Sequence, residues 1–437
     1  MTTSSGTASD SDRWAPGAVS GLHVPADAEA LLSGGTAFLT EAFRSSGALS
    51  GDNSVSRIVA SQGFEAGGTG KKLLLTVAYE KPGPGLPEEL FVKFSRNFDN
   101  ELWDSGRHQL ASEVAFAVLS RSPDFPVPVP LVLFADVDPE THTGLIVTEC
   151  IPYGRDGVEP HHPKCLDYVV PDQVGHYEAI LRGLARLSGA HRAGRLSPEF
   201  DREFPYDPAA GAATAKAMAR AQVPGAKVVQ WAERLFDFVD RYPQLFPAHA
   251  RDVAFRERFL TDIPVVLGAG ERVTALLHGN PDLIAFAHWN ANIDNCWFQR
   301  DAEGRLEAGF LDWANAGQLS VAQSITGAIS GAEPFLWDEH LDQLLTVFIE
   351  EYAAAGGPRL DLDELRLHIL VMAASGLPHS MGAPIALTRE VPDLESLESN
   401  HDPRLVDHEN ARIQLHMTTK LLHLWESQHL GDLIRSL

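Results

Sequence analysis

Residues 288–295 read His-Trp-Asn-Ala-Asn-Ile-Asp-Asn, and the triplet Leu-Asp-Trp follows at residues 311–313. Between them, two short apolar runs at 296–299 and 306–311 flank turn-forming residues, which predicts a two-stranded hairpin. Such a hairpin brings Asn295 and Asp312 to the same end. An amide and a carboxylate supply the oxygen ligands that Mg²⁺ prefers, with phosphate oxygens completing the shell. The stretch therefore predicts a metal-nucleotide site.

Composition narrows the classes of protein that carry this site. The chain has 437 residues, of which 44% are hydrophobic and 22% are charged, as in an ordinary globular protein with room for two lobes. Its net charge of −24 disfavours nucleic acid or an anionic membrane as the main partner. No apolar run reaches membrane-spanning length. The three cysteines lack paired spacing, so we expect a reduced, cytoplasmic protein. Oligomeric state leaves no signature in the sequence.

The predicted secondary structure changes near residue 150 from mainly strands to mainly helices, which predicts two lobes. A disordered segment is expected before them, at residues 1–22. Residues 23–150 begin with an amphipathic helix at 25–44 and continue as short strands with one helix at 109–120. Residues 151–437 show long helical periodicity, and this lobe contains the 288–313 strip. The clearest helices are expected at 172–192, 226–262, 338–355, 361–375 and 407–434. The acidic stretch 386–405 is expected to be a surface loop. The expected fold class is α+β, with a small antiparallel sheet and a larger, mostly helical part.

Lys93 lies in the middle of the apolar strand Leu90-Phe91-Val92-Lys93-Phe94. A buried ammonium is costly unless it is paired, and Glu113 in the next helix is the natural partner. The pair is suited to holding an α/β-phosphate. Taken alone, an edge-strand lysine that points to water is the simpler interpretation. Together with Glu113 and the motifs at 288–313, however, the phosphate-binding interpretation of Lys93 is favoured.

The glycine-rich stretch 63–70 lies between two strands, which excludes a Rossmann turn and a Walker loop because both need a helix N-terminus. It fits a hairpin that covers bound phosphates, with Gly67, Gly68 and Gly70 as the expected binding residues. A plain turn is an equal alternative. Lys71 and Lys72 at its rim are as well explained by a solvated charge pair. Glu149 ends a strand before an apolar connector that could meet an adenine edge; an ordinary interdomain loop is the alternative.

The histidines outside the strip are assigned structural roles. His191 is interpreted as a satisfied histidine in a helix. His161 and His162 lie in a proline-flanked loop with no further ligand at useful spacing, which argues against zinc there.

Over roughly residues 50–330, the order of the motifs resembles that of the aminoglycoside phosphotransferase and choline kinase-like family. These motifs are, in sequence order, the glycine hairpin, Lys93, Glu113, the connector at Glu149, His288-x-Asn290-x4-Asn295 and Leu311-Asp312-Trp313. The resemblance implies a bilobal protein-kinase-like fold and transfer of the ATP γ-phosphoryl group to a small-molecule hydroxyl. It places the phosphate lysine on Lys93, the metal ligands on Asn295 and Asp312, and the catalytic loop on His288 to Asn295. The family's catalytic aspartate falls on Asn290.

An amide at position 290 cannot accept a proton at neutral pH, so general-base help of about 10²–10⁴-fold is absent there. Positioning and charge neutralisation carry most of the rate of phosphoryl transfer, and Asn290 can still hold a hydroxyl. Asp294 is the neighbouring carboxylate that could substitute as the base. The first hypothesis is therefore an ATP- and Mg²⁺-dependent phosphotransferase with an atypical loop. The alternatives are an inactive nucleotide-binding pseudokinase with a regulatory role and, last, a protein that keeps the fold without binding nucleotide. The acceptor is unidentified; an acidic segment at 393–409 suits a cationic one, although a solvated loop explains it better.

Overall fold

The computed structural model describes residues 13–64, 70–208, 224–314 and 316–437. The chain divides into two compact units. The first runs to Asp156 and also takes in Ser197–Glu203 and Phe310–Ala316. The second comprises Gly157–Leu196, Phe204–Gly309 and Gly317–Leu437. The segment around Asp312 therefore belongs to the first unit, whereas the sequence analysis had placed it in the helical lobe.

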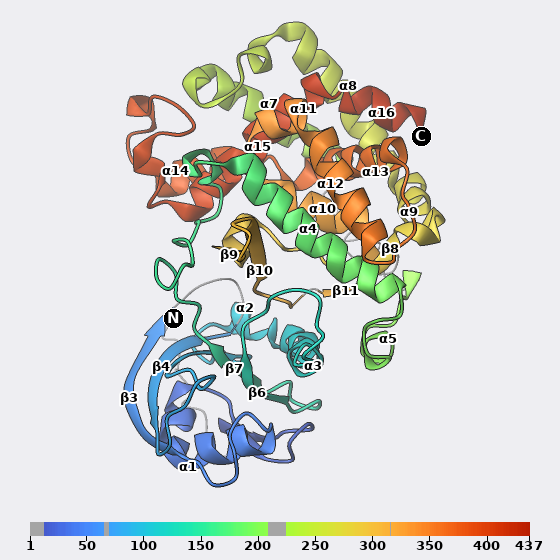
Figure 1. Cartoon of the computed structure of the whole chain (residues 1–437). Helices are drawn as coiled ribbons and strands as arrows, with labels where there is room; N and C mark the ends of the chain where they lie inside the picture. Colours follow the sequence, from blue (N-terminus) through green and yellow to red (C-terminus); the bar gives the residue numbers. More distant parts are fainter. Residues whose placement is uncertain (1–12, 65–69, 209–223, 315) are drawn as a thin grey trace. The chain divides into compact units, whose positions relative to one another are not determined.

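The first unit is built on a five-stranded antiparallel sheet with the strand order β3-β4-β5-β7-β6 (Figure 1). Its strands are β3 (Val55–Phe64), β4 (Lys72–Tyr79), β5 (Glu89–Phe94), β6 (Val132–Val137) and β7 (Gly144–Glu149). Burial alternates along most of β4, and Val92 and Lys93 of β5 enter different surroundings, so the sheet has two distinct faces. The strands that the sequence predicted are all present.

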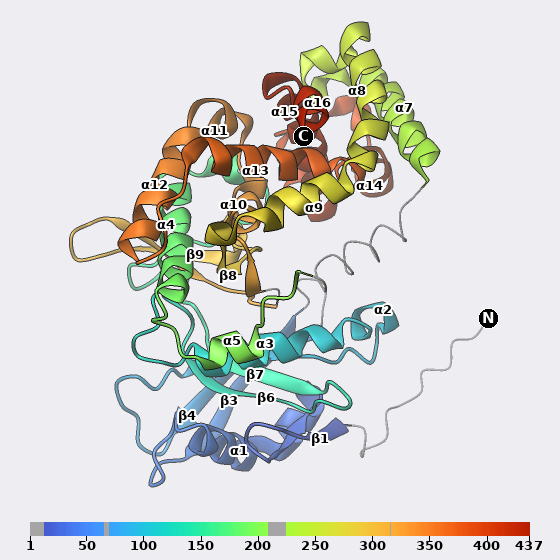
Figure 2. The same cartoon turned by 90° about the vertical axis from the view of Figure 1, so that its right-hand side faces the viewer.

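Helices cover both faces of this sheet (Figure 2). Helix α1 (Ala28–Ser45) packs Leu39 and Phe43 against alternate residues of the central strands, including Leu75 and Val92, to form the main core. Helix α3 (Leu110–Leu119) lies on the opposite face over β6 and β7, and α5 (Glu199–Glu203) lies beside α3. Because side chains alternate along a strand, Lys93 points to the α3 face while its neighbours Val92 and Phe94 enter the α1 core.

The first part of the described chain is ordered where a disordered lead-in was expected. Strand β1 (Trp14–Pro16) pairs with β2 (His23–Pro25). In the turn between them, the backbone N–H groups of Val19 and Ser20 donate to the buried carboxylate of Asp136 at 2.9 and 2.8 Å. Trp14 packs edge-on against Phe38 of α1. The expected disordered segment is thus too long at its C-terminal end, and residues 1–12 lie outside the described residues.

The second unit is mostly helical (Figure 1). Helix α4 (Gln173–Arg192) packs along α12 (Leu341–Ala354) and beside α10 (Val321–Ala328). The other longer helices are α7 (Gly225–Arg241), α8 (Val253–Gly268), α9 (Gly270–Gly279), α13 (Leu362–Ser375) and α15 (Glu409–Ser427). The shorter ones are α11 (Pro334–Glu339), α14 (Ala383–Glu390) and α16 (Leu430–Ser436). The expected fold class, a small antiparallel sheet with a larger helical part, is confirmed.

Three sequence predictions in this unit need correction. The helix expected at 226–262 is two helices, because Pro243 and Pro247 interrupt it between α7 and α8. The helix expected at 407–434 breaks at His429, which has a positive φ of 49°. The expected loop at 386–405 begins as α14 and buries Leu394 and Leu397.

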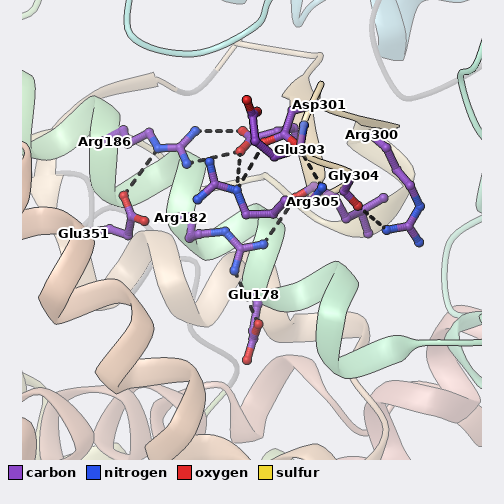
Figure 3. A network of polar contacts seen from close by, with 11 residues as sticks. Glu178, Arg182, Arg186, Arg300, Asp301, Glu303, Gly304, Arg305 and Glu351 are labelled. Carbon is purple, nitrogen blue, oxygen red and sulfur yellow. Dashed lines mark hydrogen bonds and ion pairs between the residues drawn. The ribbon is translucent and has the colours of Figure 1, made fainter.

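The hairpin predicted between the two halves of the strip is confirmed. Strand β9 (Cys296–Arg300) pairs with β10 (Leu306–Phe310), and β8 (Ile284–His288) pairs with β11 (Ala316–Ser320). Charged side chains attach the hairpin to α4 (Figure 3). Arg186 donates to Glu307 of β10 at 2.7 Å and to Glu351 of α12 at 3.4 Å, and Arg182 donates to the Leu306 carbonyl oxygen at 3.2 Å. These contacts fix β10, which pairs with β9, the strand that follows Asn295.

Among the described residues, no single helix is both long enough and apolar enough to cross a bilayer. One bent pair, Leu362–Ser375 with Leu377–Glu390, meets those length and composition criteria jointly, with a 42° bend between its halves.

Candidate functional site

One candidate site is a buried ion cluster in the first unit. The Lys93 Nζ lies 2.7 Å from Glu113 Oε2 and 3.0 Å from Asp312 Oδ1. Lys93 is only 8% exposed. Burial alone would lower the pKa of Lys93, but the carboxylates of Glu113 and Asp312 hold it above its ordinary value. The pairing predicted from the sequence is therefore present, and Lys93 is a fixed cation at neutral pH.

Asp312 is placed by the residues that follow it. The Trp313 ring stacks on Phe116 of α3, with ring centroids 3.9 Å apart and planes inclined by 12°. One turn away on α3, the Ser112 hydroxyl donates to the Ala314 carbonyl oxygen at 2.9 Å. Asp312 itself adopts a left-handed backbone conformation with φ of 55°. A non-glycine residue held in that region costs about 1–3 kcal/mol, and such strain concentrates at functional sites. The apolar partner of Trp313 and the hydrogen bond of Ser112 hold Asp312 beside Lys93.

Lys72, one of the two lysines at the rim of the glycine-rich stretch, is a second cation at this cluster. Lys72 of β4 is the direct cross-strand neighbour of Lys93 in β5, so both side chains leave the same face of the sheet. Lys72 is 8% exposed and donates to the Gly70 carbonyl oxygen at 3.3 Å. Burial raises the pKa of Glu113, and the charges of Lys93 and Lys72 oppose that rise. The solvated pair expected for Lys71 and Lys72 is thus wrong for Lys72, whereas Lys71 pairs with the exposed Asp99.

Only part of the predicted glycine hairpin can be described. Gly67 and Gly68 lie outside the described residues. Gly70 has a φ of +58°, and a Cβ built there would meet the Phe94 carbonyl oxygen at 1.8 Å. Only glycine permits that approach. Gly70 therefore lets the end of the hairpin pass directly over the end of β5, next to Lys93.

Glu149 has a structural contact of its own. Its carboxylate accepts a hydrogen bond from the Leu131 backbone at 2.8 Å. In the connector that follows, the Cys150 N–H donates to the Glu89 carbonyl oxygen at 2.9 Å. The Glu149 side chain thus holds the chain just before β6, and the connector is held by the Cys150 backbone.

A separate candidate region in the second unit is the 288–295 loop, which contacts α10. His288 ends β8 and is fully buried, and its carbonyl oxygen accepts from the Ser324 hydroxyl at 2.8 Å. Helix α10 approaches so closely at Gly327 that a Cβ there would meet the Trp289 carbonyl oxygen at 1.6 Å. His288 therefore anchors the loop by its backbone and its burial.

Within the loop, three asparagines form a chain of amide hydrogen bonds. Asn292 Nδ2 donates to the side-chain oxygen of Asn290 at 3.1 Å, and Asn295 Nδ2 donates to the backbone oxygen of Asn290 at 2.8 Å. Ser330 in turn donates to Asn292 at 2.5 Å. An amide that donates through its nitrogen keeps its oxygen as an acceptor, so Asn295 Oδ1 retains ligand capacity. Asn292 and Ser330 were missed because neither carries a motif of its own.

Asp294 lies on another side of the loop. Its carboxylate is 3.8 Å from Lys164 Nζ, and its backbone oxygen contacts His161 Nε2 at 3.0 Å. Burial raises the pKa of Asp294. Its contacts are those of a loop anchor, and its role as a substitute base stays a prediction.

Two further expectations concern histidines. His191 accepts a hydrogen bond from the Phe286 backbone of β8 at 3.1 Å, which confirms its structural role. His162, by contrast, has metal-ligating neighbours that the spacing did not reveal. Glu159 lies three residues before it and His176 comes from α4, and the three candidate ligand atoms lie within 4.8 Å of one another.

No protein-family model matches this chain. No curated protein matches it either. Among solved structures, it is similar to a candidate aminoglycoside phosphotransferase from Ralstonia eutropha JMP134, at 12% identity over 83% of this chain and 92% of that chain, with a TM-score of 0.41. It is also similar to choline kinase from Cryptosporidium parvum Iowa II, at 11% identity over 85% and 91%, with a TM-score of 0.41. A third is a spectinomycin phosphotransferase in complex with ADP and spectinomycin, at 10% identity over 84% and 94%, with a TM-score of 0.38. Similarity at this level does not by itself carry an argument about function, so the proposal below depends on the residues.

The substitution Glu113→Gln tests the energetics of the ion cluster. Removing one partner of a buried pair leaves an incompletely compensated charge, at a typical loss of 3–5 kcal/mol. Because Asp312 remains, we expect a decrease of about 3 kcal/mol in the free energy of unfolding, measured by urea denaturation. The exposed Glu140→Gln is the matched control. Equal stabilities of the two variants would show that the cluster contributes nothing to the fold.

Proposed function

We propose that this protein is an ATP- and Mg²⁺-dependent phosphotransferase that acts on a hydroxyl of a small molecule. The observation that carries the proposal is Lys93, a buried cation held between Glu113 and Asp312. A purely structural ion pair needs one carboxylate. The second carboxylate lies on a strained residue with a partly exposed side chain, which suits a ligand better than it suits the fold.

In this proposal the first unit binds the nucleotide. Lys93 contacts the α/β-phosphates, and Glu113 keeps its ammonium in place. Lys72 supplies a second positive charge from the neighbouring strand. Gly70 brings the hairpin backbone close to the same place, and Gly67 and Gly68 are proposed as further cofactor-binding residues. The connector that follows Glu149 is proposed to meet the adenine edge through backbone groups.

Asp312 and Asn295 are the proposed metal ligands. Both fit a hard cation: Asp312 carries a partly exposed carboxylate, and Asn295 keeps its amide oxygen while its nitrogen is engaged. A bound Mg²⁺ would neutralise charge on the phosphate oxygens. Lys93 and Lys72 add fixed positive charge, so the chain's own contribution to rate is electrostatic.

The loop residue Asn290 positions the acceptor hydroxyl. Its side-chain oxygen already accepts from Asn292, which fixes the orientation of the amide, and its second lone pair remains for a hydroxyl. The transfer forms a bond between the acceptor oxygen and the γ-phosphorus, breaks the bond to the β-phosphate oxygen and releases the hydroxyl proton. Because Asn290 cannot take that proton, we propose a slow enzyme. The alternative, favoured by the same amide, is a nucleotide-binding pseudokinase with a regulatory role.

The compartment and the acceptor complete the proposal. Cys150, Cys165 and Cys296 all carry free thiols, which supports a reducing compartment such as the cytoplasm. The acceptor class is a small hydroxylated molecule.

Binding of nucleotide is the first test. We expect ATP to raise the unfolding temperature of the wild-type protein more with Mg²⁺ than without it, because bound ligand stabilises only the folded state. Asp312→Asn should remove the Mg²⁺-dependent part, whereas the exposed Asp124→Asn should retain it. Calorimetric titration gives the affinities. A wild-type protein that binds ATP with no metal dependence would contradict the assigned roles of Asp312 and Asn295.

The neighbouring lysines give a matched pair of variants. We expect Lys72→Met to weaken ATP binding by about tenfold, which corresponds to about 1.4 kcal/mol. Lys71→Met should leave the affinity within about twofold of wild type, because that side chain is partly exposed and paired with Asp99. Titration of both variants with ATP and excess Mg²⁺ measures the difference. Equal effects of the two substitutions would remove Lys72 from the site.

The substitution Asn290→Asp separates the two functional alternatives. A carboxylate at this position can accept the hydroxyl proton and the hydrogen bond from Asn292, so we expect kcat to rise by at least about tenfold. Turnover is measured as ADP release across a panel of hydroxylated acceptors. A slow wild-type enzyme accelerated by the substitution supports the phosphotransferase. Turnover that appears only in Asn290→Asp supports the pseudokinase, and binding without turnover in either protein contradicts the proposed reaction.

A further inference from the structure

A cluster of metal-ligating side chains lies outside the site described above. Glu159 and His162 belong to the segment that begins the second unit, and His176 lies in the first turns of α4. His176 Nε2 is 2.9 Å from Glu159 Oε2, and His162 Nε2 is 3.4 Å from the same oxygen. Ligand atoms about 2.1 Å from a tetrahedral zinc ion lie roughly 3.4 Å apart. The three groups are thus spaced as ligands of one ion.

The tautomer of His176 explains why a cation belongs here. Its Nδ1 lies 2.6 Å from the Asp172 carbonyl oxygen, which can only accept, so Nδ1 carries a proton and donates it. In the neutral imidazole Nε2 is then a bare lone pair, directed at a carboxylate oxygen of Glu159. Two lone pairs at 2.9 Å repel unless a proton or a metal ion lies between them. A backbone carbonyl that orients the far nitrogen is also the usual outer-shell partner of a metal-ligating histidine.

The surroundings hold the two imidazoles in place. Both rings pack against Phe298 of β9, with centroids 5.7 Å away for His162 and 4.6 Å away for His176. The Glu159 N–H donates to the Phe298 carbonyl oxygen at 2.8 Å. His176 is 4% exposed, whereas the Glu159 side chain is 30% exposed. The cluster therefore has a buried, preorganised side and an open side, the form of a site with three protein ligands and one water.

We propose that Glu159, His162 and His176 bind a divalent transition-metal ion, with zinc as the ion of first choice. Two imidazole nitrogens and one carboxylate select zinc and its neighbours over Mg²⁺, which prefers oxygen ligands only. The ion fastens the segment 159–162 to α4 beside β9, the strand that follows Asn295. This site is independent of the proposed nucleotide-binding function, and its metal differs in kind from the one assigned to Asp312.

The test uses the full-length protein, stripped with a chelator and titrated calorimetrically with zinc chloride. We expect about one zinc ion per chain, retained in excess Mg²⁺. His162→Gln and His176→Gln should each weaken zinc binding by at least about tenfold. His161→Gln is the matched control, because His161 is the neighbour of His162 and contacts the Asp294 backbone instead. Equal losses in the control and in the two ligand variants would overturn the assignment.

A spectroscopic measurement covers the case in which a variant does not fold. In the wild-type protein, zinc X-ray absorption should show imidazole scattering with nitrogen and oxygen ligands at about 2.0–2.2 Å. Zinc should also raise the unfolding temperature of the stripped wild-type protein in the absence of nucleotide. A stripped protein that takes up no zinc, or zinc without imidazole ligands, would show that the cluster holds a protonated histidine only.

Discussion

The first unit depends on the requirement that a buried ammonium be paired. Lys93 leaves the centre of the sheet on the α3 face, where an uncompensated charge would cost several kcal/mol. Glu113 meets it from α3, and Asp312 meets it from a segment that is distant in the sequence. The stacking of Trp313 on Phe116 helps to pair Lys93, because it holds the residue after Asp312 on α3. One charge thus determines where a helix and a distant segment pack.

In the second unit, the asparagines of the 288–295 loop are held by uncharged hydrogen bonds and not by an ion cluster. Its loop is organised by amides, with Asn292 and Asn295 both donating to Asn290. Amides can fix geometry without carrying charge, so they position groups but cannot take up a proton. The first unit therefore presents fixed charge, and the loop of the second unit presents oriented amides. The proposed phosphoryl transfer would use both properties, because electrostatics and positioning carry most of the rate of such reactions.

Sequence reasoning worked where local pattern decides the outcome and failed where register or packing does. The strand that contains Lys93, the helix that contains Glu113 and the hairpin after Asn295 all follow from periodicity and turn residues. The burial of Lys72 was not predicted, because it depends on the register between β4 and β5, which places Lys72 beside Lys93. The partnership of His162 with His176 was missed for the same kind of reason, since it depends on how a loop packs on α4. All of residues 288–313 were assigned to the helical lobe, because sequence order alone does not show that Trp313 stacks on Phe116 of α3.

The most direct test of the central claim is covalent labelling with an acyl-phosphate derivative of ATP, which acylates lysines that contact bound phosphates. Peptide mass spectrometry then identifies the modified positions. We expect modification of Lys93 and Lys72, and we expect an excess of unlabelled ATP with Mg²⁺ to suppress it. Modification confined to exposed lysines such as Lys71 and Lys81, unaffected by competing nucleotide, would contradict a phosphate site at the Lys93 cluster.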